Sequence, residues 1–221
     1  MSRNAYVDLC VHLQSLRRIA EEAKSPLVPA LGVAGSVYTH QVANVLRVLT
    51  DIRVRHLLAD EVGLGKTIQA LMILNALRRQ RRDLRALVVV PDTALMVQWR
   101  DELMTRAHTT PFETHTPGEG QYVRLAWEEQ LRKKGQDGEP LFSLGDIDPD
   151  RYQVLIVDEM HRLRGDVKDR IVRVAAAFEH VLILTATPSF QRPDRQAQLF
   201  AMLEPERTAR ALGCVTDKRC D

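Results

Sequence analysis

Cysteines, aromatic residues and long apolar runs are all scarce in this sequence. The cysteines Cys10, Cys214 and Cys220 are odd in number and lack metal-ligand spacing, so neither a disulfide framework nor a cysteine zinc site is predicted. The sequence shows no apolar run of membrane length and no signal peptide. We therefore expect a protein of the reducing cytoplasm without a membrane partner.

A strong excess of one charge is also lacking. The net charge is only +2, so composition alone does not indicate a nucleic-acid partner. With 45% hydrophobic and 27% charged residues, the 221-residue chain has the composition of a globular protein with one sizeable core. For the basic cluster after residue 77 we favour a solvated helix end over a DNA-binding patch; its members are Arg78, Arg79, Arg81, Arg82 and Arg85.

Residues 54–67 contain the first strong functional pattern. Residues 54–58 form an apolar run of buried-strand length, glycines follow, and residues 68–77 are typical of a helix. A strand, a glycine loop and a helix N-terminus in this order form the architecture of a phosphate-binding P-loop. One departure is visible, because Asp60 stands where the pattern G-x-x-x-x-G-K-[ST] has its first glycine.

The residue types of this loop suit a bound nucleotide. Gly63 and Gly65 allow backbone N–H groups to close on phosphate oxygens without interference from a Cβ atom. Lys66 is expected to reach the β- and γ-phosphates, and the Thr67 hydroxyl to bind Mg²⁺. The sequence therefore predicts a site for ATP and Mg²⁺.

A second pattern ends at Asp158 and Glu159. The apolar residues 154–157 predict a buried strand that delivers these two carboxylates to its carboxyl end. In a P-loop enzyme, Asp158 would hold Mg²⁺ and Glu159 would orient or deprotonate the attacking water. We therefore predict that Lys66, Asp158 and Glu159 are catalytic.

The remaining elements are predicted from periodicity and breakers. An N-terminal helix and linker over residues 1–35 precede the main lobe over 36–205, and a polar tail covers 206–221. Thr93 is expected to be the N-cap of its helix. Helices are expected over residues 4–24, 42–49, 94–106, 122–134, 162–178 (interrupted near Gly165) and 196–203, and strands over 84–90, 112–116, 141–144 and 181–184.

Taken together, the motifs resemble one known family. They are a glutamine before the P-loop at Gln41, DEVGLGKT at 60–67, VVVPDTALMVQW at 88–99, DEMH at 158–161 and LTATP at 184–188. In this order the set looks like the first RecA-like lobe of superfamily-two helicases, and within them the Swi/Snf-type translocases of double-stranded DNA. The LTATP form leans toward the bacterial branch resembling the RNA-polymerase-recycling ATPase.

The resemblance implies an α/β fold of the RecA-like P-loop type, with a mostly parallel sheet between two layers of helices. It implies that Gln41 contacts adenine, although a lone glutamine at a helix start is more often structural. The residues expected to couple the nucleotide to DNA are His161, Thr185 and Thr187, and the loop from Pro91 to Thr93 is expected to touch the DNA backbone. Met160 replaces the small residue usual before the histidine, and the family's asparagine after T-x-T-P has no counterpart.

Members of this family hydrolyse ATP between two RecA-like lobes, and the second lobe supplies arginine fingers. The chain ends at Asp221, too soon after Pro188 for a second lobe. We therefore expect ATP binding with very slow hydrolysis, in a fragment of a longer translocase or in a subunit completed in trans. Two alternatives stay open: a nucleotide-dependent module that binds a protein such as RNA polymerase, and a lobe of an RNA helicase.

Overall fold

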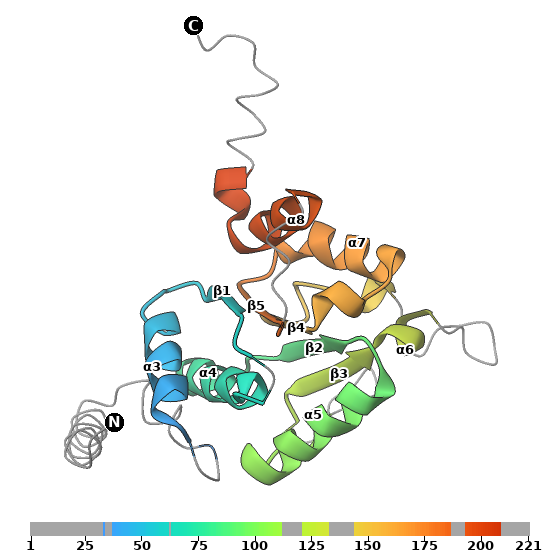
Figure 1. Ribbon diagram of the computed structural model, residues 1–221. Helices are drawn as coiled ribbons and strands as arrows, with labels where there is room; N and C mark the ends of the chain where they lie inside the picture. Colours follow the sequence, from blue (N-terminus) through green and yellow to red (C-terminus); the bar gives the residue numbers. More distant parts are fainter. Residues whose placement is uncertain are drawn as a thin grey trace, which may run out of the picture.

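The computed structural model describes residues 33, 37–61, 63–111, 121–132, 144–186 and 193–208. At its centre lies a five-stranded sheet in the order β1-β5-β4-β2-β3, and every neighbouring pair is parallel (Figure 1). The strands are β1 (Arg55–Leu58), β2 (Ala86–Val90), β3 (Val123–Trp127), β4 (Val154–Asp158) and β5 (His180–Leu184). Because all the strands run the same way, their carboxyl ends share one edge.

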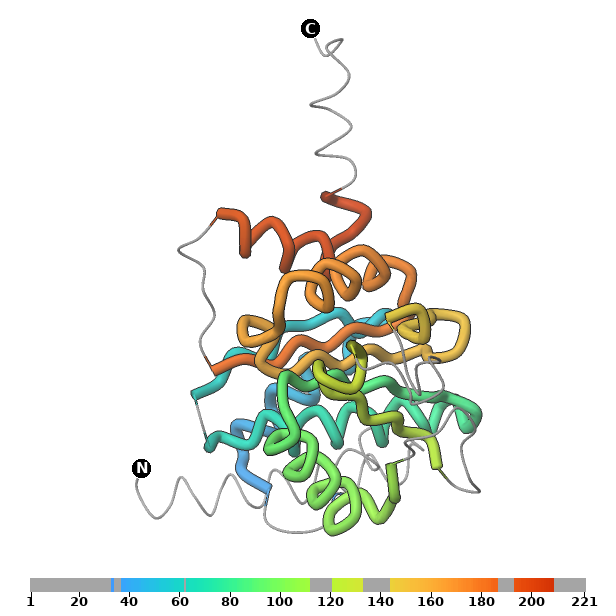
Figure 2. The backbone as a smooth tube through the Cα atoms, turned by 90° about the vertical axis from the view of Figure 1, so that its right-hand side faces the viewer, coloured from blue at the N-terminus to red at the C-terminus, as the bar shows by residue number. Residues whose placement is uncertain are grey.

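Helices cover both faces of this sheet (Figure 2). Successive strand residues point to opposite faces, so Ile156 and Leu182 pack in one apolar cluster and Leu155 and Ile183 in the other. The first cluster joins the sheet to α3 (Thr39–Val48), α4 (Lys66–Gln80) and α5 (Thr93–Arg106), and the second joins it to α7 (Gly165–Ala175) and α8 (Pro193–Leu203). The predicted three-layer α/β fold is confirmed.

The helix expected over residues 122–134 is wrong. Residues Val123–Trp127 form β3, which pairs in register with Ala86–Val90 of β2, and only Glu128–Arg132 are helical, as α6. The charged and long side chains of this segment favour a helix locally, but pairing with a buried strand overrides that preference. Arg124 is accordingly fully buried within a strand.

Several boundaries also differ from the expectation. Asp92, and not Thr93, is the N-cap of α5, because its carboxylate oxygen Oδ1 accepts a hydrogen bond of 2.9 Å from Leu95 N. The helix expected over 162–178, with an interruption near Gly165, is a 3-10 turn, η2 (Met160–Arg162), followed by α7, which begins at Gly165 and ends three residues earlier than expected. Leu144, expected to end a strand, begins the 3-10 turn η1 (Leu144–Asp146).

Some predicted segments lie outside the described residues. They include the N-terminal helix over 4–24, the strand over 112–116 and most of the strand expected over 141–144. Of the predicted tail, residues 206–208 belong to a helical turn, and the rest lies outside the described part. Within the described ranges, no helix has both the length and the apolar character needed to span a membrane.

The start of β5 contains a buried histidine that makes the stability of the fold sensitive to pH. The His180 ring nitrogen Nδ1 accepts a hydrogen bond of 3.0 Å from Val54 N, at the entry to β1. Burial is the main cause that lowers the pKa of His180 below its ordinary value, while Glu179 acts in the opposite direction. The folded state therefore favours the neutral ring, which can accept this bond.

Because the pKa of His180 is lower in the folded state, its stabilising contribution is complete above the unfolded value, about 6.5, and declines as the pH falls below it. Protonation also removes the acceptor of a buried N–H group, which costs on the order of 1–3 kcal/mol. Urea unfolding at pH 7.5 and 5.5 should show a smaller loss of stability for His180→Gln than for the parent chain. An equal loss in both proteins would contradict this expectation.

Candidate functional site

A cleft of about 550 Å³ opens at the carboxyl edge of the sheet, between the start of α4 and the face of α5. The structure brings most of the predicted nucleotide residues together here, although their roles remain predictions. The cleft is lined by Gln41, Gly63, Gly65, Lys66, Thr67, Asp158 and Glu159, and also by Tyr38, Ile68, Leu95, Gln98, Glu102 and Arg106. The last four come from α5, and none of these six additional residues was predicted.

The glycine loop has the geometry that its glycines permit. Gly63 and Gly65 have φ angles of 83° and 78°, in the left-handed region that other residues rarely adopt. At Gly65, a Cβ atom would lie 2.2 Å from the Gln41 side-chain nitrogen Nε2, so a larger residue would clash there. Gly65 is also the N-cap of α4, which directs the helix N-terminus at the cleft.

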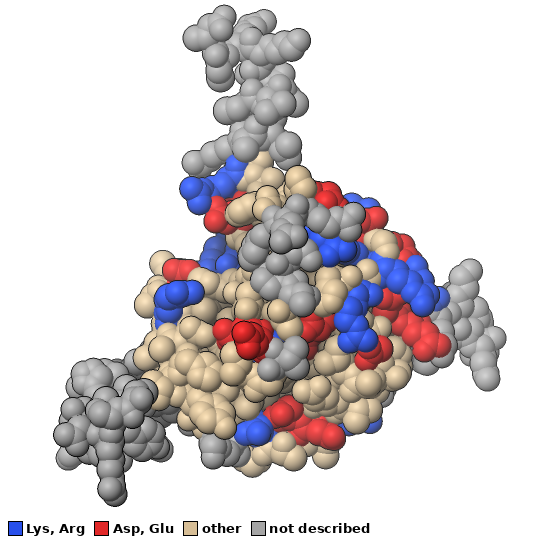
Figure 3. Space-filling model, viewed as in Figure 1, with Lys and Arg blue, Asp and Glu red and all other residues tan. Residues whose placement is uncertain are grey.

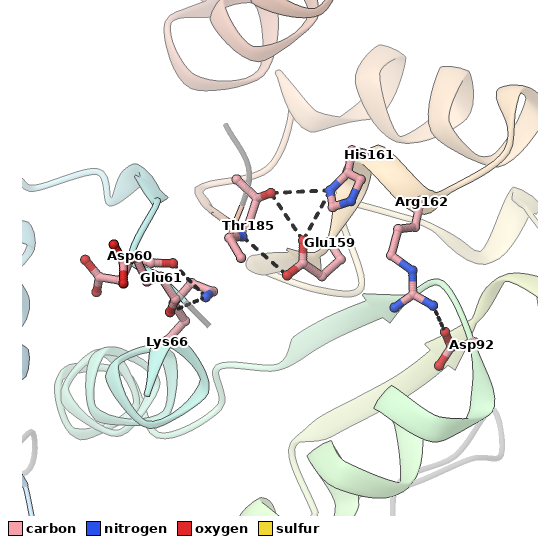
Figure 4. Close-up of polar contacts among 9 residues, drawn as sticks. Asp60, Glu61, Lys66, Asp92, Glu159, His161, Arg162 and Thr185 are labelled. Atoms are coloured by element: carbon pink, nitrogen blue, oxygen red, sulfur yellow. Dashed lines mark hydrogen bonds and ion pairs between the residues drawn. The ribbon is translucent and has the colours of Figure 1, made fainter. Parts of the chain in front are cut away.

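Lys66 rests on its own loop in this structure. Its ammonium nitrogen Nζ donates hydrogen bonds to the main-chain carbonyls of Asp60, at 2.8 Å, and of Glu61, at 3.1 Å (Figure 4). Both acceptors are neutral, so these contacts hold the ammonium at the cleft without cancelling its charge. A phosphate could therefore displace these two carbonyls, because its hydrogen bond to the ammonium is charge-assisted and stronger.

Gln41 is buried and uses both ends of its amide within the protein. Its Nε2 donates to Leu64 O at 2.9 Å, and its Oε1 accepts from Tyr38 N at 3.0 Å. The side chain, which is 1% exposed, thus caps the start of α3 and supports the P-loop. Its contact with adenine stays a prediction.

Asp158 ends β4 and is 4% exposed. Burial is the main cause that raises the pKa of this carboxyl above its ordinary value, and a hydrogen bond from Trp99 opposes that shift. Trp99 is fully buried in the core, and its indole Nε1 donates to Asp158 Oδ2 at 2.9 Å and so orients the carboxylate.

Mg²⁺ prefers oxygen ligands and usually takes only one or two from the protein. Thr67 and Asp158 line the same cleft, so their hydroxyl and carboxylate fit this donor set. The raised pKa of Asp158 shows that its negative charge is poorly stabilised by the protein alone. A bound cation would supply the missing stabilisation.

Glu159 is held by groups from two strand ends. Its Oε2 accepts from Thr185 Oγ1 at 3.2 Å and lies 3.2 Å from His161 Nδ1, and its Oε1 accepts from Ala186 N at 3.3 Å (Figure 4). The residue itself has a φ angle of 44°, which turns the chain sharply after β4. His161 and Thr185, predicted to act in coupling, thus contact the predicted catalytic glutamate.

The loop Pro91–Thr93 follows β2 and lines a second cavity, of about 350 Å³, beside α6. Basic and acidic side chains alternate over α6 and the start of α7 (Figure 3). Asp92 pairs with Arg162, while Glu128 lies 3.3 Å from Arg164 and 3.7 Å from Arg132. The basic groups at the predicted DNA loop are therefore balanced by nearby carboxylates. Thr187 lies outside the described residues.

Comparison with known families agrees with this geometry. A family model described as "Type III restriction enzyme, res subunit" matches residues 35–190. The chain belongs to this helicase-type family. The family and the fold thus place the chain among the lobes of superfamily-two helicase-type proteins.

Within that class the lobe is of the Swi/Snf type. The chain is 35% identical over 211 residues to the RNA polymerase-associated protein RapA of Photobacterium profundum, covering 85% of this chain and 20% of that protein. It is 32% identical over 216 residues to RapA of Vibrio campbellii, covering 88% and 21%. The chain therefore spans about a fifth of the length of these curated relatives.

Solved structures show the same fold. The SWI2/SNF2 ATPase core of Sulfolobus solfataricus, in complex with double-stranded DNA, superposes with a TM-score of 0.61 at 18% identity, over 79% of this chain and 37% of that one. The UvsW helicase of bacteriophage T4 gives a TM-score of 0.53 at 14% identity, over 73% and 56%. At these identities the likeness concerns the fold alone.

Proposed function

We propose that the cleft binds ATP with Mg²⁺ and hydrolyses it, as the nucleotide-binding lobe of a Swi/Snf-like DNA-dependent ATPase. The observation that carries this proposal is the meeting of Lys66 and Thr67 with Asp158 and Glu159 in one cleft, although the two pairs lie far apart in the sequence. Phosphoryl transfer depends mainly on positioned charge around the phosphates. Lys66 supplies a positive charge, Thr67 and Asp158 supply oxygen ligands for a metal ion, and Glu159 supplies a base for water.

Each residue has a distinct task in this proposal. Lys66 leaves the carbonyls of its loop and binds the β- and γ-phosphates, while Thr67 and Asp158 hold the metal. Mg²⁺, when bound, neutralises charge on the phosphate oxygens. Glu159 orients the attacking water and accepts its proton, and the hydrogen bonds from Thr185 and Ala186 hold its carboxylate in place.

The DNA partner is proposed from the class of the lobe and from the loop Pro91–Thr93. Contacts to DNA phosphates rather than to bases would hold the duplex, so binding should tolerate any sequence and weaken with salt. A second RecA-like lobe would supply the arginine finger, which is worth about 10³–10⁵ in turnover. We therefore propose that the 221-residue polypeptide binds ATP but turns it over slowly until such a lobe is added.

The nucleotide site is tested by measuring the Kd of a fluorescent ATP analogue, with Mg²⁺, for the purified chain. Lys66→Ala should raise the Kd by about tenfold or more, because the charge-assisted bonds to phosphate are lost. Lys168→Ala, which removes the same charge from α7 on the other layer, serves as the matched control. Equal affinity of the Lys66 variant and the parent would refute the proposed site.

Two alternatives remain for the output of nucleotide binding. A binding module without hydrolysis, for example one that docks on RNA polymerase as the name of the RapA relatives suggests for those proteins, needs Lys66 but not Glu159. An RNA helicase lobe would be stimulated by RNA. The rate of ATP hydrolysis after addition of a second lobe, measured with duplex DNA and with RNA, separates a DNA-dependent ATPase from an RNA helicase lobe. Function that survives Glu159→Gln but not Lys66→Ala would indicate the binding module.

A further inference from the structure

The P-loop of this chain begins with a carboxylate where a glycine is usual. Asp60 lies two residues beyond the end of β1, and its main-chain carbonyl accepts the bond of 2.8 Å from Lys66 Nζ. The backbone of Asp60 therefore lies beside the ammonium of Lys66, and the negative Asp60 side chain is attached at that point. Unless something holds it elsewhere, it would compete with phosphate for that ammonium.

Two amides hold this carboxylate. Gln69 Nε2 donates to Asp60 Oδ2 at 2.6 Å, and Asn44 Nδ2 lies 3.4 Å from the same oxygen. Asn44 Nδ2 also donates to Gln69 Oε1 at 3.2 Å. Because a carboxylate can only accept, the amino groups of both amides must face it, which fixes their orientation.

The amides come from the two helices that flank the P-loop. Gln69 lies in the first turns of α4, is fully buried, and its main-chain N–H bonds to Gly65 O. Asn44 lies one turn after Gln41 in α3, and Gln41 holds the other end of the loop through Leu64 O. The packing of α3 on α4 thus determines where the Asp60 side chain can go.

We infer that Gln69, assisted by Asn44, is a positioning residue of the nucleotide site. It binds the Asp60 carboxylate outside the phosphate-binding loop and so keeps the Lys66 ammonium available for the nucleotide. Through Asp60 it sets the affinity for ATP without touching the ligand itself. This inference rests on the proposed function of the cleft.

The test is a double-mutant cycle on the Kd for ATP in the presence of Mg²⁺. Gln69→Leu keeps the size of the side chain but removes both polar groups. With Asp60 present it should raise the Kd by about tenfold, because the released carboxylate then competes with phosphate for the Lys66 ammonium. With Asp60→Asn in the same chain, the released side chain has no charge, and Gln69→Leu should raise the Kd by less than about threefold.

A merely structural role of Gln69 predicts a different pattern. In that case Gln69→Leu would raise the Kd for ATP by the same factor with Asp60 present and with Asp60→Asn, and this result would overturn the inference. If Gln69→Leu fails to fold, Asn44→Ala, at a partly exposed position, is measured in both backgrounds and should show the same dependence on Asp60, with a smaller loss.

The parent chain and Lys66→Ala separate the two levels of the argument. If the parent does not bind ATP with Mg²⁺, both the proposed function and the inference fail. If the parent binds and Lys66→Ala does not, but the cycle shows no dependence on Asp60, only the positioning role of Gln69 is rejected.

Discussion

Replacing Glu159 with glutamine should lower the rate of ATP hydrolysis by about 10²–10⁴-fold and change ATP affinity little. Glutamine has nearly the same shape: its amide oxygen can accept the bond from Ala186 N, and its amino group can donate to Thr185 Oγ1, which faces the other carboxylate oxygen in the parent. It cannot accept the proton of the attacking water. The expected loss therefore falls on the chemical step.

Single-turnover hydrolysis, with protein in excess over radiolabelled ATP, measures this step even when the isolated chain is slow. The matched control is Glu179→Gln, because Glu179 is a partly exposed glutamate that pairs with Arg81 away from the cleft. A Glu159 variant that hydrolyses ATP at the parent rate would exclude this residue as the base. If the Glu159 variant loses hydrolysis but keeps the protein's function in the cell, the alternative of a nucleotide-dependent binding module is favoured.

Replacing Asp158 with asparagine should have opposite effects on the free and the nucleotide-bound protein. Without ligand, the variant should unfold at a higher temperature at pH 7.5, because burial makes the charged carboxylate unfavourable, as its raised pKa shows. The asparagine carbonyl can still accept the bond from Trp99 Nε1. With saturating ATP and Mg²⁺, the parent should be the more stable protein, since only it gains metal-dependent binding energy.

The pH dependence of this difference follows from the sign of the shift. A carboxyl whose pKa is raised in the folded state binds its proton more tightly there, so the parent gains stability as the pH falls through that folded value toward the unfolded value, about 3.9. The advantage of Asp158→Asn is thus greatest above the folded pKa and shrinks in acid. Thermal unfolding at several pH values, with and without ligand, checks both parts; a variant less stable than the parent at pH 7.5 without ligand would contradict the first.

Local sequence patterns were sufficient for prediction where the structure of a segment depends mainly on its own residues. The P-loop was predictable because its strand, glycines and helix start are contiguous, and Asp158 and Glu159 because they follow an apolar run of strand length. The segment at 123–132 was mispredicted, since its local preference for a helix opposes its pairing with β2. Asp92 was overlooked as the N-cap because neighbouring Asp and Thr are both favourable at that position.

By itself the sequence determined the α/β class through the order of its motifs, and it predicted a phosphate-binding loop and an acidic pair at a strand end, since each of these two patterns lies in neighbouring residues. Only the tertiary structure decided which distant groups hold them: Trp99 on Asp158, Thr185 on Glu159, and Gln69 with Asn44 on Asp60. Such pairs are set by the register between strands and by the packing of α3, α4 and α5 on the sheet. Those are long-range contacts, and the hydrophobic spacing along any one segment carries no information about them.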